Sequence, residues 1–227
     1  DSDPERRPLS VLECDLVGST RLSEELDPEA YRDCMLSYIR AVEEGVASHG
    51  GYVAEQSGDS LMGYFGYPRA SEDDGALAIE AALAILSHLA AARDDERPVS
   101  ARIGIATGLC VVGGTGARVP PGRWSVAAFG TVTNRAARVE KLAAPGTLVV
   151  DEATRRTCPG RFAFADLGEH RLEGLDGLQR IWRVDGRSRP GVASGRPDTS
   201  ASGAIVGREE ELSRLAELWH QACRGQG

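Results

Sequence analysis

Pro8-Leu-Ser-Val-Leu-Glu-Cys-Asp15 and, one residue later, Val17-Gly18-Ser19-Thr20 are the two runs from which the architecture can be predicted. The first run is mostly apolar and predicts a β-strand that ends at an acidic residue. The second run predicts a tight turn that leads into a helix. The backbone N–H groups at this helix start could face a polyphosphate, just beyond the carboxylate of Asp15.

Helices and strands are predicted on the C-terminal side of these runs. Asp27 and Pro28 are typical of an N-cap and first helical residue, and the helix runs to about His49. Residues 52–55 and 61–65 predict a β-hairpin with an acidic tip at Ser57-Gly58-Asp59-Ser60. The same patterns predict helices at 71–92 and 131–143 and strands at 99–107, 109–114, 126–130, 147–150, 161–166 and 179–184.

The order strand, helix, hairpin, helix, strand indicates the fold class. It predicts an α+β protein, a ferredoxin-like sandwich in which helices pack on a sheet rich in antiparallel pairs. Many functions share this fold, so the function has to be argued from the site.

Composition and charge restrict the partners. The net charge of −8 argues against a nucleic acid held through its phosphates, but not against a phosphorylated small molecule. Polar residues interrupt the longest apolar stretch, around 76–91, so we expect no membrane span. No export signal opens the sequence, and the five cysteines are scattered, which together indicate a cytoplasmic protein.

Two aspartates and a polar helix face are the candidate site. The first strand of such a sheet can lie beside the hairpin, which would bring Asp15 close to Asp59. Two carboxylates with open positions suit Mg²⁺ when substrate phosphates supply the remaining oxygens. Asn134 and Arg138 are four residues apart and share a helix face. Taken singly, each feature has an ordinary reading as a turn residue, a cap or a solvated helix face.

Three ordered motifs resemble one family. Val11-Leu-Glu-Cys-Asp15-Leu-Val-Gly-Ser-Thr20 resembles the first metal-binding motif of class III adenylyl and guanylyl cyclases, and Gly58-Asp59 resembles the second. Phe129-Gly-Thr-Val-Thr-Asn134-Arg-Ala-Ala-Arg138 is similar to the family's Asn-x-x-x-Arg helix. The resemblance extends from about residue 8 to 184.

The resemblance implies a reaction and a set of roles. The protein would convert ATP or GTP into the 3′,5′-cyclic monophosphate and pyrophosphate with two Mg²⁺ or Mn²⁺ ions. In homodimeric relatives the polar helix reaches the partner's aspartates, so the resemblance implies a homodimer with shared active sites. The implied metal positions are Asp15, Leu16 and Asp59; the implied phosphate positions are Gly18, Ser19, Thr20 and Arg171; Asn134 would orient the ribose and Arg138 would stabilise charge on the α-phosphate.

Several positions depart from the family pattern. Glu55 and Ala127 stand at the base-reading positions: a carboxylate suits guanine, alanine offers no hydrogen bond, and the base stays undecided. Glu13 replaces a typical Phe; we favour a solvated edge residue over an extra acid near the metals. Glu173 stands where a phosphate-binding Lys is typical, which makes Arg171 the nearest substitute. The alternative function is therefore a degenerate domain that binds nucleotide and regulates an attached ATPase.

The predicted domain organisation has four parts. The segment Ile205-Val-Gly-Arg-Glu-Glu-Glu-Leu212 resembles the opening of the ATPase module of STAND-type regulators. The stretch before it is rich in Ser, Gly, Pro and Arg, as flexible linkers are. The parts are an N-terminal tail (1–7), a nucleotidyl cyclase domain (8–185), a linker (186–204) and the truncated start of an ATPase-type module (205–227).

Overall fold

The computed structural model describes residues 5–91, 99–114 and 126–188. The chain divides into two compact units, residues 1–190 and 191–227, and the fold described below is that of the first. Most of the predicted linker and the whole predicted ATPase segment lie outside the described residues. The linker and the module therefore stay predictions.

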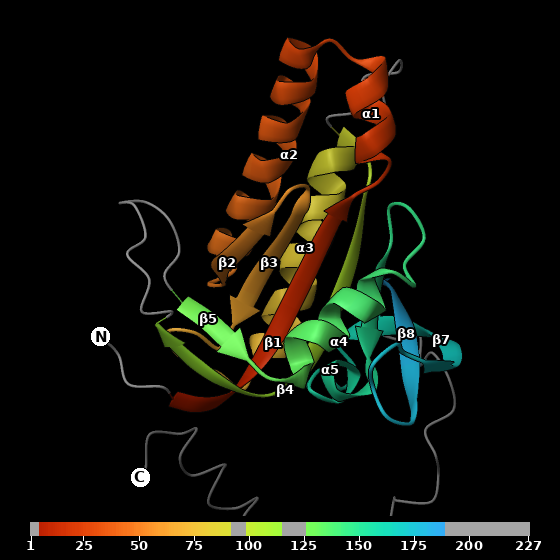
Figure 1. Cartoon of the computed structure of the whole chain (residues 1–227). Coiled ribbons are helices and arrows are strands. Elements are labelled where there is room, and N and C mark those ends of the chain that lie inside the picture. Colours follow the sequence, from red (N-terminus) through yellow and green to blue (C-terminus); the bar gives the residue numbers. More distant parts are fainter. Residues whose placement is uncertain (1–4, 92–98, 115–125, 189–227) are drawn as a thin grey trace, which may run out of the picture. The chain divides into compact units, whose positions relative to one another are not determined.

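An eight-stranded, largely antiparallel sheet forms the centre of this unit (Figure 1). Seven strands follow the order β2-β3-β1-β4-β6-β8-β7, and β5 pairs with the far end of β4. Only β4 and β6 run parallel among the described strands. The strands are β1 (Glu5–Leu16), β2 (Tyr52–Ser57), β3 (Ser60–Phe65), β4 (Ala101–Gly114), β5 (Val126–Phe129), β6 (Leu148–Asp151), β7 (Phe162–Arg171) and β8 (Leu178–Arg187).

Helices cover both faces of the central strand β1. Side chains alternate along a strand, so Leu12, Cys14 and Leu16 join the core formed with α2 and α3, while Leu9 and Val11 pack with α4 on the other face. Glu13 and Asp15 belong to the α4 face by the same alternation. The helices are α1 (Ser19–Glu25), α2 (Pro28–Ser48), α3 (Asp74–Ala91), α4 (Thr131–Glu140) and α5 (Glu152–Arg156).

The helix α3 is apolar enough, by length and composition, to cross a membrane. Its buried residues, among them Ile79, Ala82 and Ile85, belong to the same core cluster as α2 and β1. Within the described chain α3 therefore packs as a core helix.

The predicted α+β class is confirmed, and so are the hairpin and the N-cap of α2. Asp27 accepts a hydrogen bond from the backbone N–H of Ala30 at 2.8 Å, with Pro28 as the first helical residue. The turn between β2 and β3 contains Gly58 and Asp59. These features follow from local sequence, which is why they could be predicted.

Several element limits differ from the prediction, and one helix was not predicted. β4 is one strand, where two strands were expected, because β1 pairs with it from Ala101 to Val112 and carries it through Gly108. The same pairing starts β1 at Glu5, so residues 5–7 are strand and not tail. β8 continues to Arg187, two residues into the predicted linker. The short helix α5, capped by the Asp151 side chain, was not predicted.

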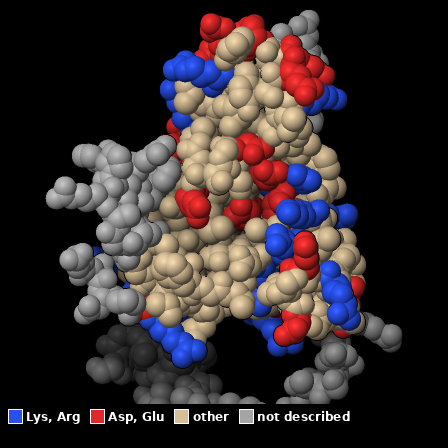
Figure 2. Space-filling model, viewed as in Figure 1, with Lys and Arg blue, Asp and Glu red and all other residues tan. Residues whose placement is uncertain are grey.

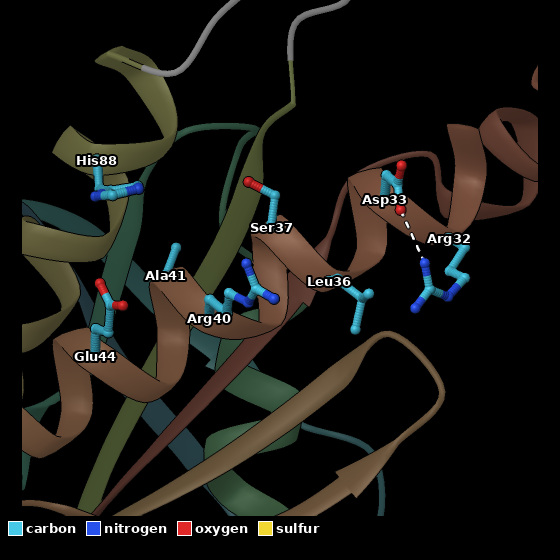
Figure 3. A pocket seen from close by; sticks show the side chains of 8 residues that line it. All are labelled: Arg32, Asp33, Leu36, Ser37, Arg40, Ala41, Glu44 and His88. Carbon is cyan, nitrogen blue, oxygen red and sulfur yellow. Dashed lines mark hydrogen bonds and ion pairs between the residues drawn. The ribbon is translucent and has the colours of Figure 1, made fainter. Parts of the chain in front are cut away.

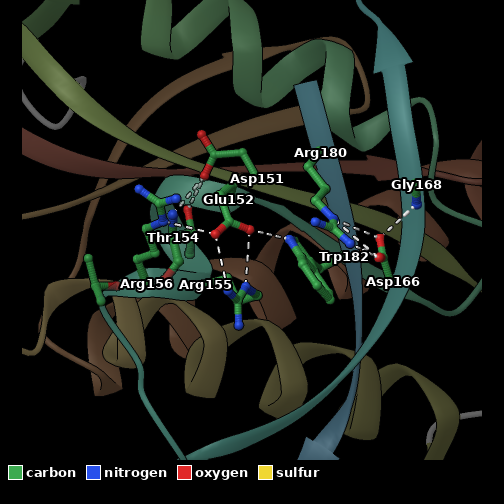
Figure 4. Close-up of polar contacts among 10 residues, drawn as sticks. Asp151, Glu152, Thr154, Arg155, Arg156, Asp166, Gly168, Arg180 and Trp182 are labelled. Atoms are coloured by element: carbon green, nitrogen blue, oxygen red, sulfur yellow. Dashed lines mark hydrogen bonds and ion pairs between the residues drawn. The ribbon is translucent and has the colours of Figure 1, made fainter. Parts of the chain in front are cut away.

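A polar network joins α5 to the strands β7 and β8 (Figure 4). The Trp182 indole donates to Glu152 at 2.6 Å, and the guanidinium groups of Arg155 and Arg180 lie 4.4 and 5.0 Å from its ring centroid. Hydrogen bonds from Arg155, and then from Arg156 and Trp182, lower the pKa of Glu152 to about 2. Trp182 thus stabilises this end of the sheet as a packing residue.

Candidate active site

Strand pairing brings the two predicted metal-binding aspartates to one place. In the β1–β3 ladder Asp15 lies directly opposite Ser60, the residue that follows Asp59. Gly58 takes a left-handed conformation, with φ of 64°, which lets the chain turn tightly and present Asp59 at the tip. Both aspartates are partly exposed. Leu16 is buried, so that only its backbone is available to a ligand.

Arg102 connects the acidic groups of this region. Its guanidinium donates to Asp15 Oδ2 at 2.7 Å, and its Nε lies 3.0 Å from Glu140 Oε1. The hydrogen bond that Arg102 donates to Asp15 is the main cause of the raised pKa of Arg102, and the charges of Glu140, Asp15 and Asp59 add to it. The guanidinium of Arg102 therefore interacts electrostatically with both Asp15 and Asp59. Sequence reasoning missed Arg102, because only the β1–β4 register places it opposite Asp15.

Glu13 is buried, which contradicts its interpretation as a solvated edge residue. Its side chain accepts a hydrogen bond from the Ser60 hydroxyl, and the residue is only 8% exposed. Burial is the main cause that raises its pKa to about 7; the Ser60 hydrogen bond opposes the shift. The sequence prediction failed because β1 is a central strand, with β3 and β4 on its sides and α4 across its face.

Glu140, at the end of α4, is a second buried acid that sequence reasoning missed. It is 4% exposed, and burial raises its pKa to about 7 against the opposing effect of Arg102. The pair is close enough for an ion pair, but Glu140 Oε1 and Arg102 Nε are not aligned for a hydrogen bond. The effect of burial on the pKa of Glu140 therefore exceeds the opposing effect of the positive charge of Arg102, which Glu140 shares with Asp15.

Asn134 and Arg138 lie on the outer face of α4, opposite its buried residues Val132 and Ala136. The Arg138 Nε donates to the backbone oxygen of Glu173 at 3.3 Å. Among the described residues, no hydrogen bond or ion pair joins Asn134 or Arg138 to either aspartate of the same chain. The polar helix face and the aspartate pair are thus separate halves of the predicted site.

The remaining predicted site residues lie near either the polar face of α4 or the pair Asp15 and Asp59. Arg171, the last residue of β7, is exposed, and so is Glu173 two residues later, whose backbone oxygen contacts Arg138. Gly18 is the N-cap of α1, with φ of 72° and no side-chain cap for the first turn, where Ser19 and Thr20 follow. This turn begins two residues after β1 ends.

Glu55 and Ala127 lie on the neighbouring elements β2 and β5. Glu55 is exposed. The hydroxyl of the buried Tyr64 accepts a hydrogen bond from the backbone N–H of Ala128, the residue after Ala127, at 3.2 Å. Burial raises the pKa of Tyr64 to about 12, and the charge of Glu55 adds to this shift. Tyr64 is thus close enough to interact with Glu55 and with the backbone next to Ala127.

The two carboxylates of the candidate site suit a hard cation that takes most of its ligands from outside the protein. Within the described ranges, no three His, Cys, Asp or Glu side chains are placed to hold a metal ion together. Mg²⁺ is commonly bound through one or two carboxylates plus substrate phosphates, and Asp15 and Asp59 offer such a pair. Acidic side chains gather where the β2–β3 hairpin turns and β1 ends, with basic side chains beside them (Figure 2).

A separate cavity of about 370 Å³ lies between α2 and α3 (Figure 3). Arg32, Arg40 and His88 line it together with Asp33 and Glu44. Its positive and negative groups balance, so no charge selects a ligand there. None of the predicted site residues belongs to it.

Comparison with known proteins identifies the relatives of this chain. Residues 3–185 match the family model described as "Adenylate and Guanylate cyclase catalytic domain". An adenylate cyclase of Mycobacterium tuberculosis is 30% identical over 85% of this chain and 43% of its own length. An uncharacterized protein of Rhizobium meliloti, R02095, is 32% identical over 98% of this chain and 22% of its own length. The chain thus spans less than half the length of these curated relatives.

Solved structures have the same fold. The adenylyl cyclase CyaB from P. aeruginosa superposes with a TM-score of 0.74 at 27% identity, covering 84% of this chain and 100% of that one. The guanylyl cyclase Cya2 superposes with a TM-score of 0.76 at 26% identity, covering 84% and 98%.

Proposed function

Because the chain belongs to the adenylate and guanylate cyclase catalytic domain family, and is thus a cyclase, we propose that it converts ATP or GTP into the 3′,5′-cyclic monophosphate and pyrophosphate. The observation that carries this proposal is the register that sets Asp15 opposite the residue after Asp59. The charges of both aspartates also act on Arg102. Two carboxylates in this arrangement can bind divalent cations under a triphosphate.

Asp15, Asp59 and the backbone at Leu16 would hold two Mg²⁺ or Mn²⁺ ions. When bound, such ions make the ribose 3′-hydroxyl more acidic and neutralise charge on the leaving pyrophosphate. Asp15 and Asp59 would thus hold the positively charged ions beside the phosphate groups of the substrate.

The chain's cationic and amide side chains would act on the substrate directly. Arg138 would stabilise charge on the α-phosphate, because a guanidinium stays protonated and offers a planar set of donors. Asn134 would orient the ribose. The turn Gly18-Ser19-Thr20 and Arg171 would contact the other phosphates. All six residues are exposed or partly exposed, as substrate contact requires.

The proposed active unit is a homodimer. Asn134 and Arg138 make no hydrogen bond or ion pair with the aspartates of their own chain among the described residues, so a second copy would supply them. Leu109, Val111 and Phe129 are 52%, 38% and 60% exposed, and Val111 lies opposite Phe129 in the β4–β5 pair. An exposed apolar cluster of this kind is typical of a protein–protein interface.

One assay tests the function and the base together. The purified chain is incubated with Mn²⁺ and either ATP or GTP, and the products are separated. We expect cyclic nucleotide and pyrophosphate in equal amounts from at least one substrate, and none after Asp59→Ala. If neither substrate yields a cyclic product at high protein concentration, the regulatory, nucleotide-binding alternative replaces the proposed reaction.

A further inference from the structure

Glu13 is a buried acid at the centre of the sheet, two residues before Asp15. On one side of it in the ladder is Met62 of β3, and on the other is Gly104 of β4. A Cβ on Gly104 would lie 2.2 Å from the backbone nitrogen of Glu140, so α4 packs directly on the sheet at this point. This packing explains why the Glu13 carboxyl is shielded from water.

Ser60 is the hydrogen-bond partner of this carboxyl. The Ser60 hydroxyl donates to Glu13 Oε1 across the β1–β3 pair. Ser60 is the first residue of β3, directly follows Asp59 and lies opposite Asp15. A diagonal contact between neighbouring strands is within reach of a long side chain. This one hydrogen bond therefore joins the base of the hairpin tip to the strand that carries Asp15.

We propose that Glu13 and Ser60 form a positioning pair, which holds the hairpin tip so that Asp59 stays beside Asp15 for cation binding. The proposal rests on the proposed cyclase function, since it gives the pair a role in arranging that site.

Two observations favour positioning over other roles. The second carboxylate oxygen, Oε2, is buried without a partner among the described residues, a cost that an apolar residue would avoid. Unlike an apolar residue, the carboxyl of Glu13 provides a hydrogen-bond acceptor for the Ser60 hydroxyl. Among the described residues no group of three acids is placed to bind a metal, so Glu13 is assigned to support the ligands and not to act as one.

Direct binding of Mn²⁺ to the chain, followed by electron paramagnetic resonance, tests the pair. We expect Ser60→Ala and Glu13→Leu, which remove the donor and the acceptor, to weaken Mn²⁺ binding about three- to tenfold. Glu13→Gln keeps an acceptor oxygen and should bind within about twofold of the wild type. In cyclase assays Ser60→Ala should raise the half-saturating Mn²⁺ concentration by the same factor, with little change in the rate at saturation.

Ser10→Ala is the matched control. Ser10 lies on the same strand, and its hydroxyl pairs with Thr107 Oγ1 at 2.8 Å on the opposite face of the sheet. This variant should bind Mn²⁺ as the wild type does, while thermal unfolding verifies that every variant is folded.

The outcomes separate this inference from the function on which it rests. Wild-type affinity in Ser60→Ala, or an equal loss in Ser10→Ala, would overturn the positioning pair while the site itself stands. If Asp59→Ala binds Mn²⁺ as tightly as the wild type, the cation site fails and the pair fails with it.

Discussion

Arg102 balances the negative charge of the candidate site. Asp15 and Glu140 lie against its guanidinium, and Asp59 is near enough to act on it. The single positive charge of Arg102 cannot neutralise all four acids, which are Asp15, Asp59, Glu140 and Glu13. Burial is the main cause that raises the pKa of Glu13 and of Glu140, the two most buried of these four acids, to about 7, and the charges of the neighbouring acids add to it. The free site is short of positive charge, which divalent cations would supply.

The raised pKa of Glu140 predicts how stability depends on pH. Its folded-state pKa of about 7 lies above the ordinary value of 4.5, so the folded protein binds the proton more tightly than the unfolded chain. The stabilisation from this proton is complete below pH 4.5 and is lost as the pH rises through 7. The loss is on the order of 3–4 kcal/mol, because the pKa rises from 4.5 to about 7 and one pKa unit corresponds to about 1.4 kcal/mol.

Urea unfolding in EDTA at pH 5 and pH 8 measures this effect. Glu140→Gln keeps the size of the side chain without its titration, so its stability should fall less between the two pH values than that of the wild type. The same fall in both proteins would show that Glu140 is not the titrating group.

Local motifs predict some residues of the candidate site, and strand pairing and helix packing determine the others. Asp15, Asp59, Asn134 and Arg138 were singled out from local motifs and spacing, and the ladder places the first two together. Arg102 and Glu140 could not be found this way, because their contacts depend on strand register and helix packing. No local motif marks either residue: Glu140 is buried where α4 packs on the sheet, and Arg102 is partly exposed on β4.

At the scale of secondary structure, the contact between β4 and α4 positions the site. The helix packs Val132 and Ala136 against the sheet and leaves Asn134 and Arg138 outside. Gly104 makes the close approach possible, since any side chain there would meet the backbone of α4. The spacing between α4 and the sheet therefore depends on the missing Cβ of Gly104.

Gly104→Ala tests this contact. The new methyl group would lie 2.2 Å from a backbone nitrogen that cannot rotate away, so we expect a loss of about 1–3 kcal/mol of stability and lower activity. Gly108→Ala on the same strand is the control, because its nearest neighbour, at 2.9 Å, is the end of the flexible Arg135 side chain. Equal effects on thermal unfolding in the two variants would contradict the explanation.

Periodicity predicted most elements but not all of their limits. The alternation of β1 and the cap of α2 are local, and both elements were found. The unbroken β4, the early start of β1 and the late end of β8 result from pairing with neighbouring strands. Local sequence does not contain this information, and Gly108 even suggests a break where the ladder continues.

For the whole molecule, the apolar cluster of Leu109, Val111 and Phe129 predicts association of two chains. A charge at its centre should be costly to bury, so Phe129→Asp should shift the protein toward monomer and lower its specific activity at least tenfold. Leu178→Asp changes an equally exposed leucine on β8 and should do neither. Sedimentation at several concentrations measures the first effect; an unchanged mass for Phe129→Asp would exclude this surface as the interface.

We propose that Asp15 and Asp59 of one chain act with Asn134 and Arg138 of another in nucleotide cyclisation. Mixing two inactive variants, Asp15→Ala and Arg138→Ala, tests it most directly, with cyclic nucleotide as the readout. Half of the dimers should then be mixed, each with one intact site, so about one quarter of wild-type activity should return. A mixture as inactive as its components, when both are folded and able to associate, would contradict the account.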